Sequence, residues 1–235
     1  MRADSLSYCA PAIYNPPRDC GLDLVYSDES LVVVNKPAGL LSVPGRGMDK
    51  TDSMTSRVCQ EFSDARSVHR LDMSTSGLLV FARGADMQRR LSHSFRERKV
   101  KKYYIALVAG QMTIPHGEID LPLSADWPNR PRQKVDFTIG KPSLTRYRQL
   151  PSTENSMRDF HLGEQSFSRV ELEPVTGRTH QLRVHMAAIG HPILGDVLYG
   201  EAASNIARLL LHAQTISFPH PCSAAQVTLI CEPPF

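Results

Sequence analysis

Apolar positions recur along the chain with two different spacings, and each spacing predicts one kind of secondary structure. Helices are predicted where apolar side chains return every three or four residues, because such residues share one face of a helix. Three segments show this spacing: 51–62 through Met54, Val58 and Phe62, 85–98 through Met87, Leu91 and Phe95, and 180–189 through Leu182, Met186 and Ile189. Gly190 and Pro192 follow the third segment and predict the end of its helix.

Strands are predicted from short apolar and β-branched runs that lie between turn residues. The runs of this kind are 31–34, 77–82, 102–109, 133–139, 143–149, 167–173, 209–218 and 225–231. Strands outnumber helices and follow one another closely along the chain. We therefore expect an α+β fold, in which a mixed and mostly antiparallel central sheet is flanked by helices.

These elements are expected to form one domain. No charged or Ser/Thr-rich linker divides the 235 residues, which are enough to bury one substantial core. Residues 1–17 contain three prolines and no periodicity, so they predict an extended N-terminal tail before a single domain at 18–235. The stretch 151–165 is polar and aperiodic, and it is expected to be a long surface loop.

Composition indicates a cytoplasmic protein without a membrane anchor. No apolar run approaches the ~20 residues that a membrane helix needs, and residues 1–17 lack the pattern of a signal peptide. The five cysteines are scattered and show no Cys-x-x-Cys spacing. They are therefore expected to be reduced thiols, as is usual in the cytoplasm.

Positive charge is clustered along the chain, although the formal net charge is only +3. Residues 83–102 hold eight Lys or Arg against two acids, and residues 128–148 hold six against one. Clustered positive charge is typical of a face that binds phosphates, although a solvated basic surface is the common alternative. In the first cluster, the candidate phosphate ligands are Arg89, Arg90, Arg96, Arg98 and Lys99.

The stretch 69–78, which reads HRLDMSTSGL, contains the strongest candidate for a catalytic group. Asp72 stands before a Ser-Thr-Ser-Gly turn, whose hydroxyl groups can hold a loop rigid through local hydrogen bonds. Active sites set the charge and direction of a carboxylate by fixing it beside a cation, here Arg70. From these residues alone, the alternative is that Asp72 caps a turn and pairs with Arg70.

Four stretches resemble the motifs of one enzyme family, and they occur along the chain in the order found in that family. The stretch 69–78 is similar to its signature, VVNKPAGLL at 33–41 to its N-terminal motif, and KKYYIA at 101–106 to its tyrosine motif. GRTHQLRVHM at 177–186, continued by HPILGD at 191–196, resembles its third motif. On these motifs the chain is identified as a member of the RluA family of RNA pseudouridine synthases, with a resemblance that extends over about residues 14–235.

The resemblance implies an activity and a fold. The activity is the isomerisation of specific uridines to pseudouridine in structured RNA, after the nucleotide is flipped out of its stack. The fold is the pseudouridine synthase fold, in which an active-site cleft crosses the middle of the sheet. Because the reaction loses no group, no cofactor is expected. The spacing of His180, His185 and His191 lacks the pair of a helical zinc site, so no metal is expected either.

The resemblance also implies roles for single residues. Asp72 is expected to be the essential catalytic carboxylate, and Arg183 the cation that pairs with it and keeps it ionised. Tyr104 is expected to stack on the uracil, while Tyr103 faces the other side of its strand. Arg70 is expected to fill the space that the extruded base leaves. The other motif residues expected at the substrate are His69, Arg178 and Leu182.

The substrate is expected to be RNA, with no role for DNA or a membrane, and the enzyme to be a monomer. The segment DWPNRP at 126–131, with QKV at 133–135, resembles the family member that modifies both a tRNA anticodon stem-loop and a 23S rRNA hairpin. Many relatives carry a separate N-terminal RNA-binding domain, for which there is no room before Tyr14. RNA recognition is therefore expected to come from the catalytic domain itself.

Two other functions fit part of the pattern. A non-catalytic RNA-binding paralogue is disfavoured, because Asp72, Tyr104 and Arg183 are all present. A base-releasing RNA hydrolase would flip its nucleotide in the same way, but it would leave an abasic site that mild base cleaves. For the isomerase, two routes stay open: Asp72 either attacks a carbon atom or abstracts the C2′ proton.

Overall fold

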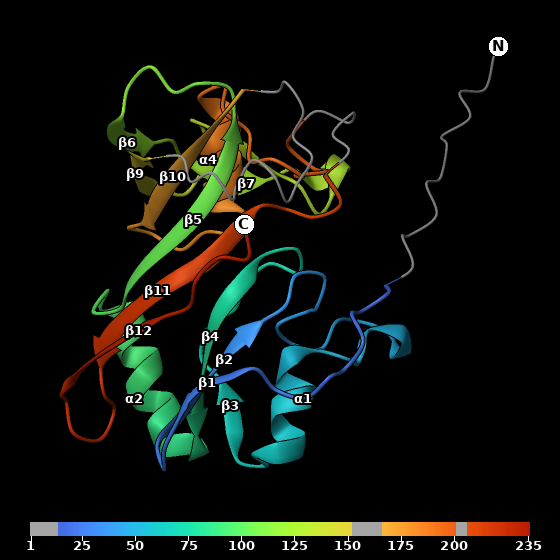
Figure 1. The fold of residues 1–235 in the computed structure, drawn as a ribbon, viewed down its shortest axis with the longest axis vertical. Coiled ribbons are helices and arrows are strands. Elements are labelled where there is room, and N and C mark those ends of the chain that lie inside the picture. The colour runs from blue at the N-terminus through green and yellow to red at the C-terminus, as the bar shows by residue number, and fades with distance from the viewer. Residues whose placement is uncertain (1–13, 152–165, 201–205) are drawn as a thin grey trace.

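A computed structural model describes residues 14–151, 166–200 and 206–235, and one large sheet forms its centre (Figure 1). The order across the sheet is β1 (Leu24–Ser27), β2 (Leu31–Lys36), β4 (Ser76–Arg83), β11 (Leu211–Pro219), β5 (Lys101–Ala109), β10 (Phe167–Pro174), β9 (Leu144–Leu150) and β6 (His116–Asp120). β12 (Gln226–Ile230) also pairs with β11, and β3 (Ala65–Ser67) with β4. A separate hairpin joins β7 (Leu123–Ala125) to β8 (Gln133–Val135).

Among the described residues, every strand pair is antiparallel except β4–β11, so the expected α+β fold is confirmed. β2 and β4 lie inside the sheet and have apolar contacts on both faces. Val32 and Val34 belong to one core cluster, and Leu31 and Val33 to another on the opposite face. This two-sided burial explains why both strands are continuous apolar runs rather than alternating ones.

The three predicted helices are confirmed as α1 (Met54–Glu61), α2 (Gly84–Arg96) and α4 (Gln181–Ala188). α1 begins with a capping box, in which the side chains of Ser53 and Ser56 bond each other's backbone N–H. Leu91 of α2 is fully buried against the β2–β4 side of the sheet. Figure 1 shows α1 and α2 beside β1–β4, with α4 toward the other end of the long strands.

The predicted strand at 133–139 is wrong beyond Val135, where β8 ends. The carboxylate of Asp136 accepts the backbone N–H groups of Thr138 and Ile139 and so forms a turn. Four short strands, β1, β3, β6 and β7, were not predicted. They have three to five residues each, and none contains four apolar residues in a row, so the sequence pattern marks them only weakly.

Parts of the predicted tail and loop lie outside the described residues, namely 1–13 and 152–165. Residues 14–17 have no regular secondary structure, but they are attached to the domain. The Tyr14 hydroxyl accepts the Leu41 N–H and donates to the Asp52 carbonyl, at 3.0 Å each. Within the described ranges, no helix is long and apolar enough to cross a membrane.

Gly77 allows β4 to lie directly against β11, which leads to a test of stability. Its φ is +112°, and a Cβ atom there would lie 2.6 Å from the Ala213 amide nitrogen and closer still to its carbonyl oxygen. Gly21 offers a matched control, because its φ is +88° with nothing within 4 Å of a Cβ. Gly21→Ala should cost only the backbone strain, about 1–2 kcal/mol. Gly77→Ala should cost a further ~1–3 kcal/mol for overpacking. Equal urea unfolding free energies for the two variants would contradict this.

Candidate active site

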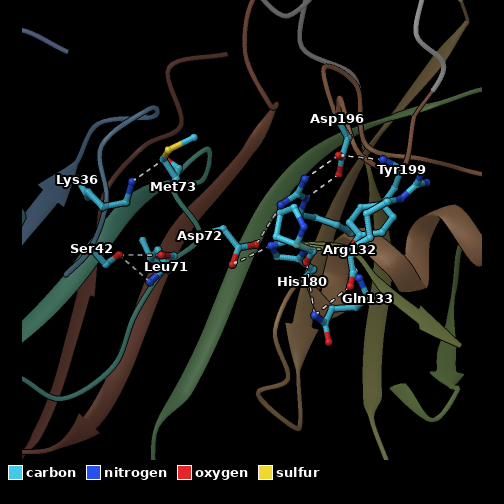
Figure 2. A network of polar contacts seen from close by, with 12 residues as sticks. Lys36, Ser42, Leu71, Asp72, Met73, Arg132, Gln133, His180, Asp196 and Tyr199 are labelled. Atoms are coloured by element: carbon cyan, nitrogen blue, oxygen red, sulfur yellow. Dashed lines mark hydrogen bonds and ion pairs between the residues drawn. The ribbon is translucent and has the colours of Figure 1, made fainter. Parts of the chain in front are cut away.

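Asp72 lies on the loop between β3 and β4, and both of its chain neighbours are held through their backbones. The Ser42 hydroxyl donates to the Leu71 carbonyl at 2.7 Å and accepts the Leu71 N–H at 3.0 Å. The Met73 carbonyl accepts a hydrogen bond from Lys36 Nζ at 3.1 Å. Figure 2 shows these contacts on one side of Asp72, so the loop presents the carboxylate from a fixed backbone.

Lys36 joins the Asp72 loop to the turn that follows β2. The side chain is fully buried, and Nζ donates to the carbonyls of Pro37 at 2.8 Å and Leu40 at 2.7 Å as well as to Met73. These bonds use all three donors of an ammonium group. Burial lowers the pKa of Lys36 to about 7, against the attraction of the Asp72 charge.

Two groups face Asp72 from the other half of the sheet. Arg183 Nη1 lies 3.4 Å from Oδ2. His180 Nε2 lies 3.9 Å from Oδ1, and Figure 2 shows His180 beside Asp72. The Asp72 side chain is 20% exposed, whereas that of Arg183 is only 4% exposed. The expected approach of Arg183 to Asp72 is therefore present, and His180 joins it.

Arg183 is held in place by Asp196 rather than by Asp72. Both Asp196 oxygens accept from the guanidinium at 2.7 Å, and this carboxylate is fully buried. Burial opposes the Arg183 charge, but hydrogen bonds and charge from Asp196, with the charge of Asp72, raise its pKa. Asp196 also accepts the N–H groups of Leu198 and Tyr199, so it holds a turn as well as Arg183.

Tyr104 and Tyr103 lie on opposite faces of β5, as strand alternation predicts. Tyr104 is 8% exposed and contributes to the cleft described below. Burial, and then the charge of Asp72, raise the pKa of Tyr104, so its phenol is neutral. Burial and the charges of Glu173 and Glu171 raise the pKa of Tyr103. Tyr103 is therefore influenced by these two glutamates rather than by Asp72.

Asp72 opens into a cleft of about 670 Å³. That size is within the range of small-ligand sites, which makes the cleft suitable for a single nucleotide. Its walls come from the Asp72 loop, the end of α2, β5, the 173–178 segment, the start of α4 and Leu211. The cations along it are Arg70, Arg96, Arg98, Lys101, Lys102, Arg178 and Arg183, against the acids Asp72 and Glu173. This excess of positive charge suits a phosphate-bearing ligand.

The structure places three of the expected substrate residues at the cleft in different ways. Arg70 and Arg178 are exposed along it. Leu182 is 6% exposed and belongs to the core cluster beneath the cleft, so it presents only an edge. The two arginines are therefore placed to contact a ligand, and Leu182 to shape the wall.

The basic cluster of α2 divides into two groups. Arg96 and Arg98 line the cleft, whereas Arg89, Arg90 and Lys99 do not. Arg89 pairs with Asp86 one turn earlier, and Arg90 donates to the Pro221 carbonyl at 3.1 Å. The sequence cluster thus does not form one continuous face toward the cleft.

His69 reaches the cleft wall, but its ring is engaged within the protein. Its Nε2 accepts the Val80 N–H at 3.0 Å, and the ring stacks on Phe95 with centroids 4.8 Å apart. Burial, with a small contribution from the Lys102 charge, lowers the pKa of His69 to about 3. The imidazole is therefore neutral and braces the loop that carries Asp72.

Reasoning from sequence missed Lys102, His180, Asp196 and Tyr199 as parts of the site. Lys102 Nζ lies 6.0 Å from the Phe95 ring centroid, and burial lowers its pKa. All except Tyr199 stand inside the quoted motif stretches, so a closer reading of those stretches could have raised them. Tyr199 carries no such signal, because only the folded chain brings it to His180.

Comparison with known proteins gives one consistent result. A family model described as RNA pseudouridylate synthase matches residues 30–188. The dual-specificity RNA pseudouridine synthase RluA of Escherichia coli (strain K12) is 46% identical over 217 residues, covering 92% of this chain and 94% of that protein. The protein of the same name from Vibrio cholerae is 49% identical over 212 residues, covering 89% of this chain and 82% of that protein.

Solved structures show the same similarity. Human RNA Pseudouridylate Synthase Domain Containing 1 superposes with a TM-score of 0.76 and 31% identity, covering 94% of this chain and 87% of that one. Human RNA Pseudouridylate Synthase Domain Containing 4 gives a TM-score of 0.68 and 25% identity, covering 90% and 88%. The fold and the sequence motifs therefore point to the same group of proteins.

The neutral His69 predicts a pH dependence of stability. In the unfolded chain this histidine takes up a proton near pH 6.5, but in the folded chain only near pH 3. The unfolded state therefore binds the extra proton, so stability falls as pH drops below about 7. In His69→Gln, the loss of unfolding free energy from pH 7 to pH 5 should be smaller by ~2 kcal/mol. His212 titrates equally in both proteins, and parallel curves would show that His69 is not the cause.

Proposed function

The chain belongs to the RNA pseudouridylate synthase family, and we propose that it modifies both a tRNA anticodon stem-loop and a 23S rRNA hairpin, with Asp72 as catalyst. Membership of the family makes it an isomerase that converts uridine in RNA to pseudouridine. One observation carries the assignment of the catalyst. The Asp72 carboxylate opens into a cationic cleft of nucleotide size, with the Arg183 guanidinium 3.4 Å away.

The reaction detaches uracil from C1′ of its ribose, rotates the base and rejoins it through C5. Asp72 serves either as the nucleophile or as the base that takes the C2′ proton, and both roles need an ionised carboxylate. The Arg183 guanidinium, 3.4 Å away, would interact favourably with that charge. Because no group is gained or lost, the reaction needs no redox cofactor.

Tyr104 and Arg70 are assigned different roles in base flipping: Tyr104 contacts the flipped base, and Arg70 fills the gap that the base leaves. The neutral phenol of Tyr104 forms part of the inner wall, where its ring would stack on the extruded uracil. Arg70 is exposed at the cleft, and its planar guanidinium would occupy the gap left in the RNA stack. An enzyme that flips a base gains from such a filler, because unstacking costs a few kcal/mol.

Two surfaces support binding of a stem-loop. Arg96 and Arg98 continue the cleft at the end of α2. The β7–β8 hairpin exposes Trp127, which is 67% accessible, with the Arg130 guanidinium 3.3 Å from its ring centroid. Exposed aromatic and basic groups together are typical of surfaces that bind unpaired RNA. The 126–131 segment of this hairpin resembles the dual-specificity member, and the relatives compared above bear that name.

We further propose that residues 18–235 act as a single catalytic domain, as a monomer in the cytoplasm. The large sheet runs through both halves of the described chain, from β1 to β12, which supports one unit. RNA recognition would then come from the cleft and from the β7–β8 hairpin.

The assignment of Asp72 is tested by Asp72→Asn, which keeps the shape of the side chain and removes its charge. Turnover should fall by at least about 10³-fold, because lost nucleophiles and bases have effects of this size. Affinity for RNA should stay within a few-fold of the unmodified protein. The measurement is tritium release from RNA labelled at uridine C5, together with filter binding.

Asp49→Asn serves as the control, since this exposed acid lies outside the cleft. It should leave turnover unchanged. If Asp72→Asn retained a tenth of normal turnover, another group would have to be the catalyst. Mild base treatment of the product completes the test, because pseudouridine leaves the RNA strand intact whereas an abasic site breaks.

The arginines on and just after α2 form two groups, which predict different salt responses. Each phosphate contact to single-stranded RNA contributes roughly 0.7 to the slope of log affinity against log salt. Neutralising Arg96 and Arg98 together, as Arg96→Gln/Arg98→Gln, should lower the slope by about 1.4. Arg89→Gln/Arg90→Gln removes the same charge from the group outside the cleft and should change it little. Equal slopes for the two double variants would contradict the division.

A further inference from the structure

We propose that His180 and Tyr199 form a positioning pair for Asp72: the Tyr199 hydroxyl fixes the His180 imidazole with its proton on Nε2, and this N–H directs the Asp72 carboxylate. The inference rests on the proposed role of Asp72 as catalyst. His180 lies immediately before α4, and Tyr199 lies in the turn that begins at Asp196. Figure 2 shows both residues on the side of Asp72 opposite Lys36 and Ser42.

The direction of the hydrogen bonds follows from Gln133. Its backbone N–H can only donate, and it lies 2.7 Å from the Tyr199 hydroxyl oxygen, which must accept. His180 Nδ1 lies 2.8 Å from the same oxygen. Among the described residues, these are the two partners of that oxygen. If the Tyr199 hydroxyl donates its proton to His180 Nδ1, the hydrogen bonds of Gln133 N–H, the hydroxyl and Nδ1 are all satisfied. A neutral imidazole that accepts at Nδ1 carries its hydrogen on Nε2.

Nε2 faces Asp72 Oδ1 at 3.9 Å, which is too long for a hydrogen bond. A movement of about 1 Å closes this distance to hydrogen-bond range. Catalytic hydrogen bonds commonly tighten in this way when substrate enters a ligand-free site. Burial lowers the pKa of His180, more than the charge of Asp72 raises it, so the ring is neutral. A neutral donor can direct the carboxylate without cancelling its charge.

Arg183 and His180 face different oxygen atoms of the Asp72 carboxylate. Arg183 approaches Oδ2 and His180 approaches Oδ1, so together they set the rotation of the carboxylate. Both are anchored by one short segment, because Asp196 holds Arg183 and Tyr199 holds His180. Asp196 also accepts the Tyr199 N–H at 3.2 Å, which closes the segment as a turn. The turn therefore acts as a common support for both groups.

The backbone of His180 is left-handed, with φ at +53°. This region is unfavourable for most L-residues, although Asn adopts it more readily than most. The backbone therefore allows a matched pair of variants. His180→Asn fits the backbone but has no donor at the Nε2 position. His180→Gln reaches that position with its amide N–H.

The test measures single-turnover rates and RNA affinity for three variants. His180→Asn should lower the rate by about 10²-fold, the cost of a misaimed catalytic group, with RNA affinity unchanged. His180→Gln should restore about ten-fold of that loss, because it returns the donor to Asp72. Tyr199→Phe should lower the rate by about ten-fold and leave affinity unchanged. A purely structural role would not be rescued by the longer amide.

The tautomer of His180 gives a second readout, and its first measurement uses the unmodified protein. Nitrogen NMR of the unmodified protein should show His180 protonated on Nε2 alone, and Tyr199→Phe should give a mixture of tautomers. Protonation on Nδ1 in the unmodified protein would overturn the proposal, as would equal rates for His180→Gln and His180→Asn. Asp72→Asn is measured alongside. If it is active, the proposed catalyst fails; if it is inactive while His180→Asn keeps the normal rate, only the positioning pair fails.

Discussion

The geometry of the whole site depends on one constraint: the partly exposed carboxylate of Asp72 is held in a fixed position and orientation. Asp72 and Arg183 are 111 positions apart in sequence, and the sheet brings them to 3.4 Å. The N-terminal half supplies a rigid loop, through the bonds of Lys36 and Ser42 to the neighbours of Asp72. The C-terminal half supplies the groups that face the carboxylate. β4 and β11, the parallel pair, join the two halves, so their register fixes the distance across the site.

The buried ion pair of Arg183 and Asp196 leaves most of the Asp72 carboxylate free for its proposed catalytic role. Burying two charges is costly, and such a pair is weak evidence for stability alone. Here Asp196 takes two hydrogen bonds at 2.7 Å, whereas Asp72 receives one long contact at 3.4 Å. Arg183 is thus satisfied elsewhere and still provides positive potential at Asp72. A bidentate pair with Asp72 would have occupied the lone pairs that the reaction needs.

Sequence patterns predicted the elements whose apolar residues are buried. They gave wrong predictions where apolar residues are exposed on the surface. The helix α2 was predicted because Met87, Leu91 and Phe95 pack on one side. Residues 136–139 belong to a predicted strand, but their apolar side chains Phe137 and Ile139 are 78% and 73% exposed. In the site, motifs identified Asp72, Arg183 and Tyr104 as candidates. The contacts of His180 with Tyr199 depend on tertiary structure, which no local spacing encodes.

The β7–β8 hairpin, which ends just before these exposed residues, also contacts the site. Gln133, on β8, gives its backbone N–H to Tyr199, whose hydroxyl meets His180 in front of Asp72. The same hairpin exposes Trp127, and the Arg132 guanidinium lies 5.6 Å from the Tyr199 ring centroid. Trp127 and Arg130 belong to the proposed RNA surface. Two hydrogen bonds in series, from Gln133 to Tyr199 and from Tyr199 to His180, therefore link this hairpin to the group that faces Asp72.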